Sequence, residues 1–254
     1  VKMLVATGGP GVVRTLLSSG KKAIGAGAGN PPVIVDDTAD IEKAAKDIVS
    51  GASFDNNLPC IAEKECFVFN SVADELISYM TANGAYLVNK EQRDRIMSFC
   101  LINKEGKYVI NKKWVGKDAR LFLKEIGIDA DPRLIICEAD EMHPFVQTEM
   151  MMPVLPIVRV NNIDEAIDMA VKAEHGCRHS AHIHSKNVER LTRFAREVET
   201  TIFVKNAPSY AGIGAGGEGH TTFTIAGPTG EGLTSARSFT RQRRCVLAEG
   251  FHIV

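Results

Sequence analysis

The stretch Pro32–Phe69, PVIVDDTADIEKAAKDIVSGASFDNNLPCIAEKECFVF, contains the pattern that decides the fold class. An apolar, β-prone run opens it at Pro32–Val35, and a second such run closes it at Cys66–Phe69. Between them, Ala39–Ala52 carries apolar residues at spacings of three and four, the period of one helical face. A strand, a helix and a second strand in this order are typical of a parallel sheet with crossover helices.

The same alternation continues along most of the chain. Apolar runs predict further strands at Met3–Thr7, Leu134–Cys137, Val154–Val160, Ser180–His184 and Thr201–Val204. Amphipathic patterns predict helices that begin near Gly11 and Ser71 and that cover Glu91–Leu101, Asp118–Ile126, Ile163–Ala173 and Asn187–Glu199. Ser71, followed three residues later by Asp74, predicts the cap of one helix. We therefore expect an α/β fold with a largely parallel sheet, followed by a tail at Ser235–Val254 with one short strand.

Composition argues against several classes of protein. The 254 residues include 30 basic and 31 acidic side chains, which leave a formal charge of -1, so we expect neither nucleic acid nor a membrane surface as a partner. No apolar run approaches the roughly 20 residues of a membrane-spanning helix, and no export signal is evident. We expect a cytoplasmic protein whose six widely spread cysteines are reduced thiols.

Cys60 is the candidate nucleophile. The approach Phe54–Cys60, FDNNLPC, is rich in Asp and Asn, which favour turns, and Pro59 restricts both itself and Leu58. This composition predicts that the preceding helix ends near Phe54 and that Cys60 lies on a rigid loop. The alternative is a buried cysteine that only packs.

Two glycine-rich segments differ in what they can bind. Gly25–Asn30 is followed by Pro31 and a strand rather than a helix, so it lacks the helix N-terminus of a phosphate loop. Its glycines instead predict a close approach to a neighbouring strand or a cofactor ring. Thr7–Gly11 lies between a strand and a helix and is either a ligand-binding turn or a plain connection. Ala211–His220 is either a flexible lid or a loop that lines a pocket.

Four of the seven histidines lie close together, with a cysteine among them: His175, His179, His182 and His184, and Cys177. Because His and Cys are zinc ligands, a zinc site is the alternative to structural histidines. In a strand His182 and His184 would share a face that excludes His179, and no second ligand cluster follows. We expect structural histidines and no metal.

Three motifs together resemble one family. They are NNLPCIAEKE at Asn56–Glu65, TEMMMPVLP at Thr148–Pro156 and GPTGEGLTSAR at Gly227–Arg237. With these motifs the chain resembles the CoA-acylating aldehyde dehydrogenases, in particular the acetaldehyde and propionaldehyde dehydrogenases of bacterial microcompartments, within the aldehyde dehydrogenase superfamily. The resemblance implies that superfamily's catalytic domain plus a remnant of its Rossmann-type cofactor domain.

The resemblance also implies a domain layout. Residues 1–31 would be the end of the cofactor-binding domain, 32–232 the catalytic domain and 233–254 a tail that contributes to assembly into a homo-oligomer, a dimer or a tetramer. Family members carry a cofactor-binding region before the point where this chain begins, and the first residue, Val1, is not methionine. We therefore expect an amino-terminal part to be missing. A location inside a bacterial microcompartment, with its shell as a possible partner, is also implied.

In the implied mechanism, the Cys60 thiolate attacks a short-chain aldehyde. Hydride leaves to NAD, or to NADP, and coenzyme A displaces the resulting thioester. Because a free thiol is only a few per cent ionised at neutral pH, we expect local positive potential or hydrogen-bond donors to lower the pKa of Cys60. The Cys60 backbone N–H would hold the oxyanion together with an Asn side chain outside this chain.

Three further positions follow from the resemblance. Gly25 stands where hydrolytic relatives have a Glu that activates water, so the thioester loses that general base and survives until coenzyme A arrives. Glu149 would bind the nicotinamide ribose, although Met151 replaces the usual Phe beside it. Thr7, Gly8 and Gly9 would approach the nicotinamide end of the cofactor. We expect the isolated chain neither to bind NAD tightly nor to turn over aldehyde.

Two other hypotheses remain open. The chain is an assembly module without catalysis, or it is an unrelated cysteine hydrolase that pairs Cys60 with a histidine such as His220.

Overall fold

A computed structural model describes residues 2–217, 219–246 and 248–250. Its centre is a seven-stranded sheet in the order β11-β10-β3-β4-β9-β8-β5, in which every neighbouring pair is parallel. The strands are β3 (Pro32–Val35), β4 (Glu65–Phe69), β5 (Ala85–Val88), β8 (Leu134–Glu138), β9 (Val154–Val160), β10 (Ser180–His184) and β11 (Ile202–Lys205). The predicted α/β fold with a largely parallel sheet is confirmed.

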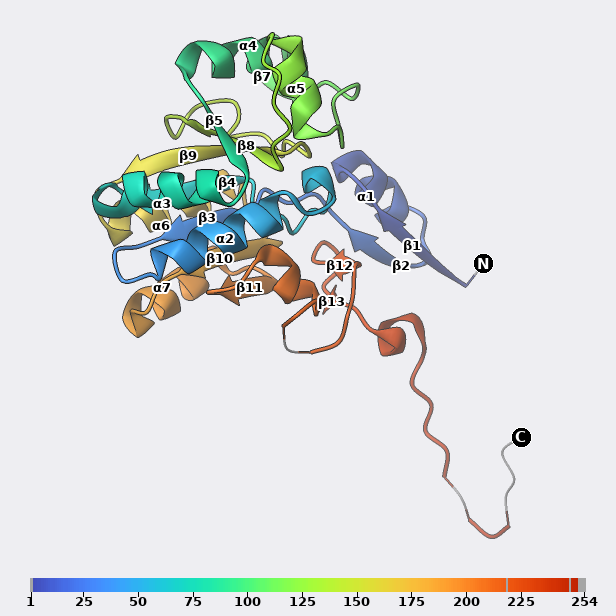
Figure 1. The fold of residues 1–254 in the computed structure, drawn as a ribbon. Coiled ribbons are helices and arrows are strands. Elements are labelled where there is room, and N and C mark those ends of the chain that lie inside the picture. Colours follow the sequence, from blue (N-terminus) through green and yellow to red (C-terminus); the bar gives the residue numbers. More distant parts are fainter. Residues whose placement is uncertain (1, 218, 247, 251–254) are drawn as a thin grey trace.

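Two pairs of helices cover the two faces of this sheet (Figure 1). Helices α2 (Ile41–Ala52) and α3 (Asn70–Ala82) pack on one face, and α6 (Ile163–Ala173) and α7 (Val188–Val198) on the other. Alternate residues of each strand serve the two layers because successive strand side chains point to opposite faces. In β3, for example, Val33 and Val35 pack under α2 and α3, whereas Ile34 packs under α6 and α7.

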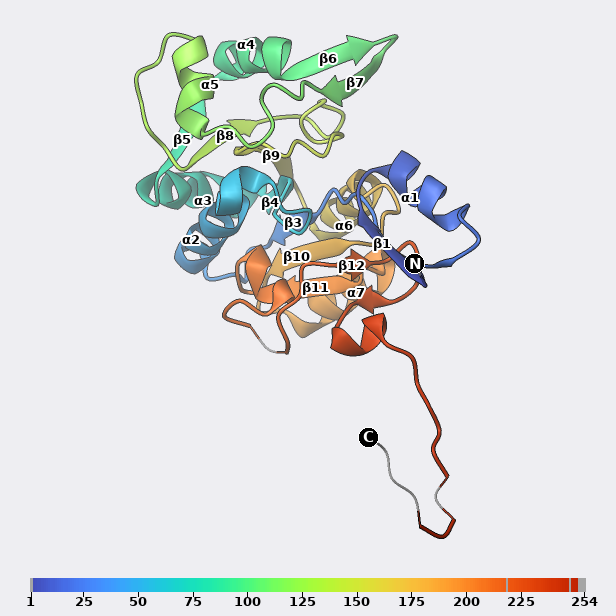
Figure 2. The same ribbon diagram turned by 90° about the vertical axis from the view of Figure 1, so that its right-hand side faces the viewer.

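A third apolar cluster lies beyond β5 and β8. It is formed by α4 (Lys90–Cys100) and α5 (Ala119–Glu125), with the hairpin of β6 (Leu101–Lys104) and β7 (Lys107–Ile110) beside them (Figure 2). The helix over residues 90–100 begins with a capping box in which Asn89 and Gln92 exchange side-chain to backbone hydrogen bonds.

Residues 2–26 form a separate small layer. Strands β1 (Met3–Thr7) and β2 (Lys22–Ala26) pair in parallel, with α1 (Pro10–Leu17) as their crossover. The carboxy-terminal part contains three short pieces, η2 (Ser209–Ile213), the pair β12 (Ile225–Ala226) and β13 (Gly232–Leu233), and η3 (Ala236–Phe239). Residues 240–246 then run away from the body as an extended segment, the start of the tail (Figure 1).

Two sequence-based expectations about the fold were wrong. Helix α3 begins at Asn70, with Phe69 as its N-cap and no side-chain cap, because β4 leads directly into the helix and leaves no room for a Ser71 cap. The tail strand predicted in Ser235–Val254 does not occur in residues 235–246 and 248–250, which contain η3; residues 247 and 251–254 lie outside the described part. An isolated tail segment has no neighbouring strand to pair with.

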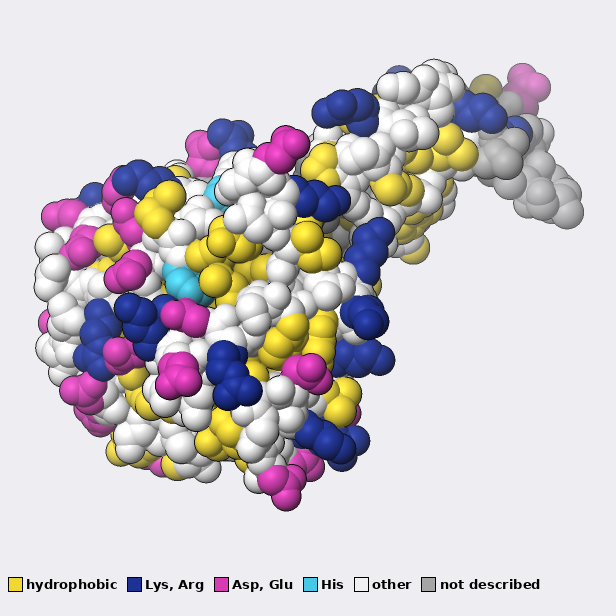
Figure 3. Space-filling view, turned by 90° about the horizontal axis from the view of Figure 1, so that it is seen from above, with side chains coloured by type: hydrophobic (Ala, Val, Ile, Leu, Met, Phe, Trp, Pro, Cys, Tyr) yellow, Lys and Arg dark blue, Asp and Glu magenta, His cyan; other side chains and the backbone are white. Residues whose placement is uncertain are grey.

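The surface carries interspersed charges. Figure 3 shows acidic and basic side chains mixed over one face, in keeping with the formal charge of -1. Among the described residues, no helix is both long enough and apolar enough to cross a membrane.

Candidate active site

Cys60 lies in a turn between α2 and β4, as the sequence predicted, and its side chain is half-buried. Helix α2 ends at Ala52 and is followed by the 3-10 turn η1 (Phe54–Asn57). Within this turn Asp55, Asn56 and Asn57 all have positive φ, at 46°, 52° and 63°. Asp and Asn tolerate this left-handed region better than most residues, which explains why the approach to Cys60 is built from them.

Gly29 joins Cys60 to Glu149. The backbone N–H of Gly29 faces Oε1 of Glu149, with an N···O distance of 3.4 Å. A Cβ atom on Gly29 would lie only 3.1 Å from the carbonyl oxygen of Cys60 and 2.8 Å from Cγ of His179. Cys60, Glu149 and His179 therefore surround one glycine.

These residues converge because of the sheet topology. Gly29, Cys60, Glu149 and His179 lie in the segments that lead into β3, β4, β9 and β10, respectively. These four strands are neighbours in one parallel sheet, so the segments that precede them meet at its amino edge. The close approach predicted for Gly25–Asn30 is also confirmed, since a Cβ atom on Gly27 would lie 2.9 Å from Pro228.

Cys60 has an apolar neighbourhood. It packs against a cluster of Ile61, Ile202, Val204, Ile213 and Ile225, to which Tyr210 and Ala211 also contribute. Residues from the glycine-rich Ala211–His220 stretch thus take part in the surroundings of Cys60. An aliphatic group bound beside the thiol would meet side chains of matching polarity.

The electrostatics of the thiol contradict the sequence-based expectation. Burial raises the pKa of Cys60, and the negative charge of Glu149 raises it further, whereas Lys64 acts in the opposite direction. The pKa of Glu149 is likewise raised by burial and lowered by Lys64 and by the Gly29 N–H. The expected pKa below that of a free thiol is therefore not present in this chain, because desolvation outweighs the single nearby cation.

Lys64 is the residue that sequence reasoning missed. In the sequence, Glu63-Lys64-Glu65 is typical of a solvated charged run, yet all three side chains are buried. The signal available was position, since the run stands between the turn of Cys60 and a fully buried strand.

The remaining predicted residues are placed elsewhere. Thr7 is the last residue of β1, Gly8 and Gly9 connect it to α1, and Gly9 is the N-cap of that helix. Gly25 packs beside Leu16, and its N–H donates to Oγ1 of Thr229 at 3.1 Å. No hydrogen bond links any of these four residues to Cys60 or Glu149 in the part of the chain that the structure describes.

Two of the clustered histidines form hydrogen bonds inside the chain. His182 forms a hydrogen bond with the carbonyl oxygen of Ile61 at 2.9 Å, and His179 with Oγ of Ser180 at 2.7 Å. Burial lowers the pKa of His182 to about 4 and that of His184 to about 3. Within the described ranges, no group of three or more His, Cys, Asp or Glu side chains is arranged to hold a metal ion.

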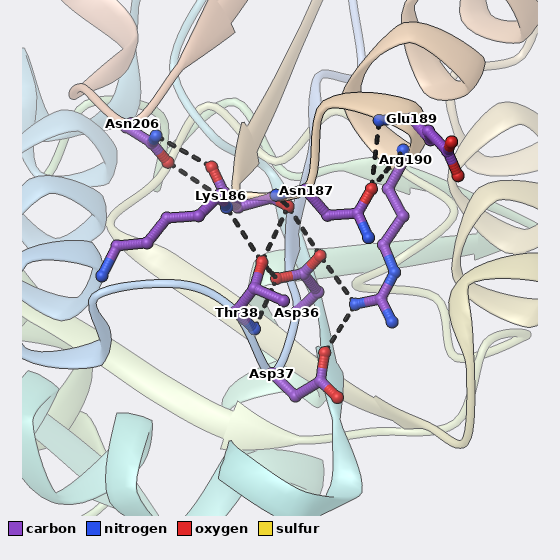
Figure 4. Close-up of polar contacts among 9 residues, drawn as sticks. Asp36, Asp37, Thr38, Lys186, Asn187, Glu189, Arg190 and Asn206 are labelled. Atoms are coloured by element: carbon purple, nitrogen blue, oxygen red, sulfur yellow. Dashed lines mark hydrogen bonds and ion pairs between the residues drawn. The ribbon is translucent and has the colours of Figure 1, made fainter.

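A second polar cluster lies at the opposite, carboxyl edge of the sheet (Figure 4). Asp36, which is fully buried after β3, accepts hydrogen bonds from Thr38, from Oγ of Ser185 at 2.6 Å and from Arg190 at 2.9 Å. Although burial alone would raise the pKa of Asp36, these hydrogen bonds lower it. The cluster joins β3, β10 and α7, and its satisfied carboxylate points to a structural role.

Two of the positions that the resemblance assigns to a nicotinamide cofactor are open to a ligand. Glu149 is only partly buried, and among the described residues its carboxylate accepts a hydrogen bond only from Gly29, so Oε2 is free to accept from a ribose hydroxyl. Above Gly9, a Cβ atom would meet nothing within 4 Å, so the backbone there is open to a ligand.

The geometry brings a half-buried cysteine and a carboxylate to one glycine at the amino edge of a parallel α/β sheet. Residues 1–235 match the sequence profile described as "Aldehyde dehydrogenase family", and the chain belongs to that family. The resemblance to its CoA-acylating members is confirmed by the relatives that follow.

The curated relatives are named as acylating aldehyde dehydrogenases. Propanal dehydrogenase (CoA-propanoylating) of Salmonella typhimurium is 54% identical over 256 residues, which cover 100% of this chain and 54% of that protein. Acetaldehyde dehydrogenase (acetylating) of Escherichia coli is 49% identical over 259 residues, covering 100% and 56%. The chain thus spans about half the length of the curated relatives it matches.

Solved structures agree with the fold. Propionaldehyde dehydrogenase of Rhodopseudomonas palustris with bound propionyl-CoA superposes with a TM-score of 0.93 at 57% identity, covering 97% of this chain and 55% of that one. The propionaldehyde dehydrogenase of a Clostridium phytofermentans fucose-utilisation microcompartment superposes with a TM-score of 0.92 at 55% identity. The match covers 99% of this chain and 57% of that one.

Proposed function

We propose that this chain provides the catalytic cysteine of a CoA-acylating aldehyde dehydrogenase, which converts acetaldehyde or propionaldehyde to the acyl-CoA. The observation that carries the proposal is the arrangement of Cys60 and Glu149 on either side of Gly29. The apolar cluster beside Cys60 supports a short aliphatic substrate. The relatives, which are propanal and acetaldehyde dehydrogenases, support the same substrate class.

The chemistry assigned to Cys60 has two halves. In the first, the thiolate forms a carbon–sulfur bond to the aldehyde carbonyl, and the carbonyl oxygen takes the negative charge. When bound, NAD(P)+ accepts the hydride that leaves this carbon, and the product is an acyl thioester on Cys60. In the second half, the thiol of coenzyme A attacks the thioester, its acyl group moves to the new sulfur, and Cys60 leaves as thiolate.

Gly25 supports acyl transfer to coenzyme A rather than to water. A glycine has no side chain that accepts a proton, so water attacking the thioester gains no general base from this position. The Gly25 N–H is engaged by Thr229, and the space beside its Cα is filled by Leu16.

Glu149, together with Thr7, Gly8 and Gly9, is proposed to hold the nicotinamide half of NAD. NADP is the other candidate, since an engineered glycolyl-CoA reductase that superposes with a TM-score of 0.92 at 56% identity has NADP+ bound. In this proposal Glu149 orients the ribose and Cys60 faces the reacting carbon.

Assembly is proposed for the tail. We assign 1–31 to a cofactor-binding domain, 32–232 to the catalytic domain and 233–254 to an assembly segment of a homodimer or homotetramer. The extended course of the described tail and its exposed side chains, Phe239 and Val246, support this assignment. A place in the cytoplasm inside a bacterial microcompartment, with the shell as partner, is proposed from the fucose-utilisation relative.

We further propose that these 254 residues alone do not turn over aldehyde, because a two-stranded layer next to Thr7–Gly9 gives a dinucleotide little to bind. The test therefore uses the half-reaction that needs no NAD. Incubation with propionyl-CoA is expected to leave a propionyl thioester on Cys60, detected by peptide mass spectrometry and sensitive to hydroxylamine. Acylation of Cys60 is supported by a structure of the propionaldehyde dehydrogenase of Rhodopseudomonas palustris, which has bound CoA and an acylated cysteine.

Cys60→Ser is expected to abolish the adduct, and Cys177→Ser, at the other half-buried thiol, is expected to retain it. An adduct on Cys177 or Cys245 with none on Cys60 would overturn the proposal. Release of propionate by a Cys60-dependent cleavage, without transfer back to coenzyme A, would favour a hydrolase. The geometry does not favour that alternative, since the ring of His220 bonds the carbonyl oxygen of Thr234 at 2.9 Å.

A further inference from the structure

Lys64 is one of the largest fully buried side chains of the described chain, with 1% of its surface exposed. Its ammonium nitrogen lies 2.8 Å from the carbonyl oxygen of Asn57, 2.6 Å from Oδ1 of the same residue and 3.3 Å from the carbonyl oxygen of Pro59. An ammonium has three N–H donors, and all three point at the short segment that leads to Cys60.

The segment that Lys64 holds is strained. Three successive residues, Asp55–Asn57, have left-handed backbones, and such conformations persist only where surrounding contacts hold them. The side-chain amide of Asn57 supplies further contacts, since it donates to the carbonyl oxygens of Ala52 at 2.8 Å and Glu63 at 3.0 Å. Lys64 and Asn57 together fasten both ends of the turn that presents Cys60.

Lys64 also sets the charge balance of the site. Four groups raise the pKa of Lys64 by their charge: Glu149 from the segment before β9, Cys60 from the turn, and Glu63 and Glu65 from its own segment. In turn, the charge of Lys64 lowers the pKa of His179, which lies in the segment before β10. Burial lowers the pKa of Lys64 to about 8, and the neighbouring acids oppose that fall. Cys60 and Glu149 thus share one buried cation.

The contact between Lys64 and Pro59 also affects the backbone N–H of Cys60. The carbonyl oxygen of Pro59 and the N–H of Cys60 belong to the same peptide group, whose atoms are coupled by resonance. A cation at the oxygen draws electron density towards it, which makes the N–H at the other end a stronger hydrogen-bond donor. That N–H is the donor expected to face an oxyanion formed at Cys60.

We propose that Lys64 is the positioning residue of the nucleophile: its buried ammonium holds the Asn57–Pro59 turn and favours negative charge on Cys60 and on the oxyanion beside it. This inference rests on the proposed role of Cys60. It assigns to a single lysine the two tasks of supporting the turn and supplying positive potential.

The test is the pH dependence of Cys60 alkylation by iodoacetamide, read at Cys60 alone by peptide mass spectrometry. Lys64→Met removes the charge with little change of volume and is expected to raise the midpoint of the profile by about one pH unit or more. Lys64→Arg keeps a charge and is expected to restore most of that shift. Lys46→Met, at an exposed position of α2, is the matched control and is expected to leave the midpoint unchanged.

A folded Lys64→Met chain with the wild-type midpoint would overturn the inference. If Lys64→Met does not fold, as judged by circular dichroism, the double variant Lys64→Met/Glu149→Gln removes one cation and one facing anion together. Its midpoint is expected to lie above that of Glu149→Gln alone, and equal midpoints would count against Lys64. Alkylation uses no coenzyme A, so an absent propionyl adduct on wild-type Cys60 would refute the proposed function separately.

Discussion

Gly29 lies directly against the side chain of His179. A Cβ atom on Gly29 would lie 2.8 Å from Cγ and 3.0 Å from Cβ of His179. Real Cβ atoms do not approach other carbons this closely, and His179 is buried. Absence of a side chain at position 29 is therefore a requirement of the candidate site.

Gly29→Ala is expected to lower the free energy of unfolding by about 1–3 kcal/mol, because the extra methyl group overpacks a filled space. It is also expected to slow alkylation of Cys60, whose carbonyl oxygen lies against the same position. Urea denaturation and the alkylation rate measure the two effects. Gly11→Ala in α1, where a Cβ atom meets nothing within 4 Å, is the matched control. It is expected to lower neither the free energy of unfolding nor the alkylation rate.

Asp36→Ala is expected to lower the free energy of unfolding by about 3 kcal/mol or more, because it leaves Ser185 and Arg190 without their buried partner. Asp37→Asn removes the exposed partner of Arg190 and is expected to cost less than about 1 kcal/mol. Since the folded pKa of Asp36 is lowered, its stabilisation is present above pH 3.8 and is lost as the pH falls through the folded pKa. Equal losses in the two variants would show that burial of Asp36 contributes nothing.

His184→Gln tests acid destabilisation. Burial lowers the pKa of His184 to about 3, against 6.5 in the unfolded chain, so unfolding takes up a proton below pH 6.5 and stability falls with falling pH. Between pH 7 and pH 5, His184 is expected to lower the free energy of unfolding by about 2 kcal/mol. The variant is expected to lose that part of the pH dependence. Ile183→Val controls for lost stability alone, and its pH dependence is expected to match the wild type.

Glu63→Gln gives a pH effect of the opposite direction. Burial raises the pKa of Glu63 to about 7, against 4.5 unfolded, while its Oε1 accepts from the N–H of Ser209 at 2.9 Å. The folded state keeps a proton that the unfolded chain releases, so the wild type loses stability relative to the variant as the pH rises from 4.5 to 7. The expected loss is about 3 kcal/mol in paired urea titrations. A constant difference across this range would contradict the raised pKa.

Local sequence patterns predicted most of the main elements because each pattern is decided within one segment. The periodicities of β9, α6 and β10 gave Val154–Val160, Ile163–Ala173 and Ser180–His184, and the structure has the same bounds. Short elements were missed: β2, β5 and the hairpin of β6 and β7 have too few residues for a period to stand out. The cap at Ser71 failed because strand β4 enters its helix without a loop.

The candidate site was only partly predictable. Cys60 on its turn and the close approach of Gly29 followed from residue types, since Asn, Asp, Pro and Gly restrict or widen backbone choice locally. The raised pKa of Cys60 did not, because desolvation depends on what the other strands bring around the thiol.

The sequence by itself determined the alternation of strands and helices and the turn that presents Cys60, because backbone propensity and apolar spacing act over a few residues. Only the tertiary structure decided that Gly29, Glu149 and His179 meet Cys60 at one edge of the sheet, and that Lys64 is buried beneath it. These outcomes depend on strand order and on the removal of water, which couple residues more than a hundred positions apart.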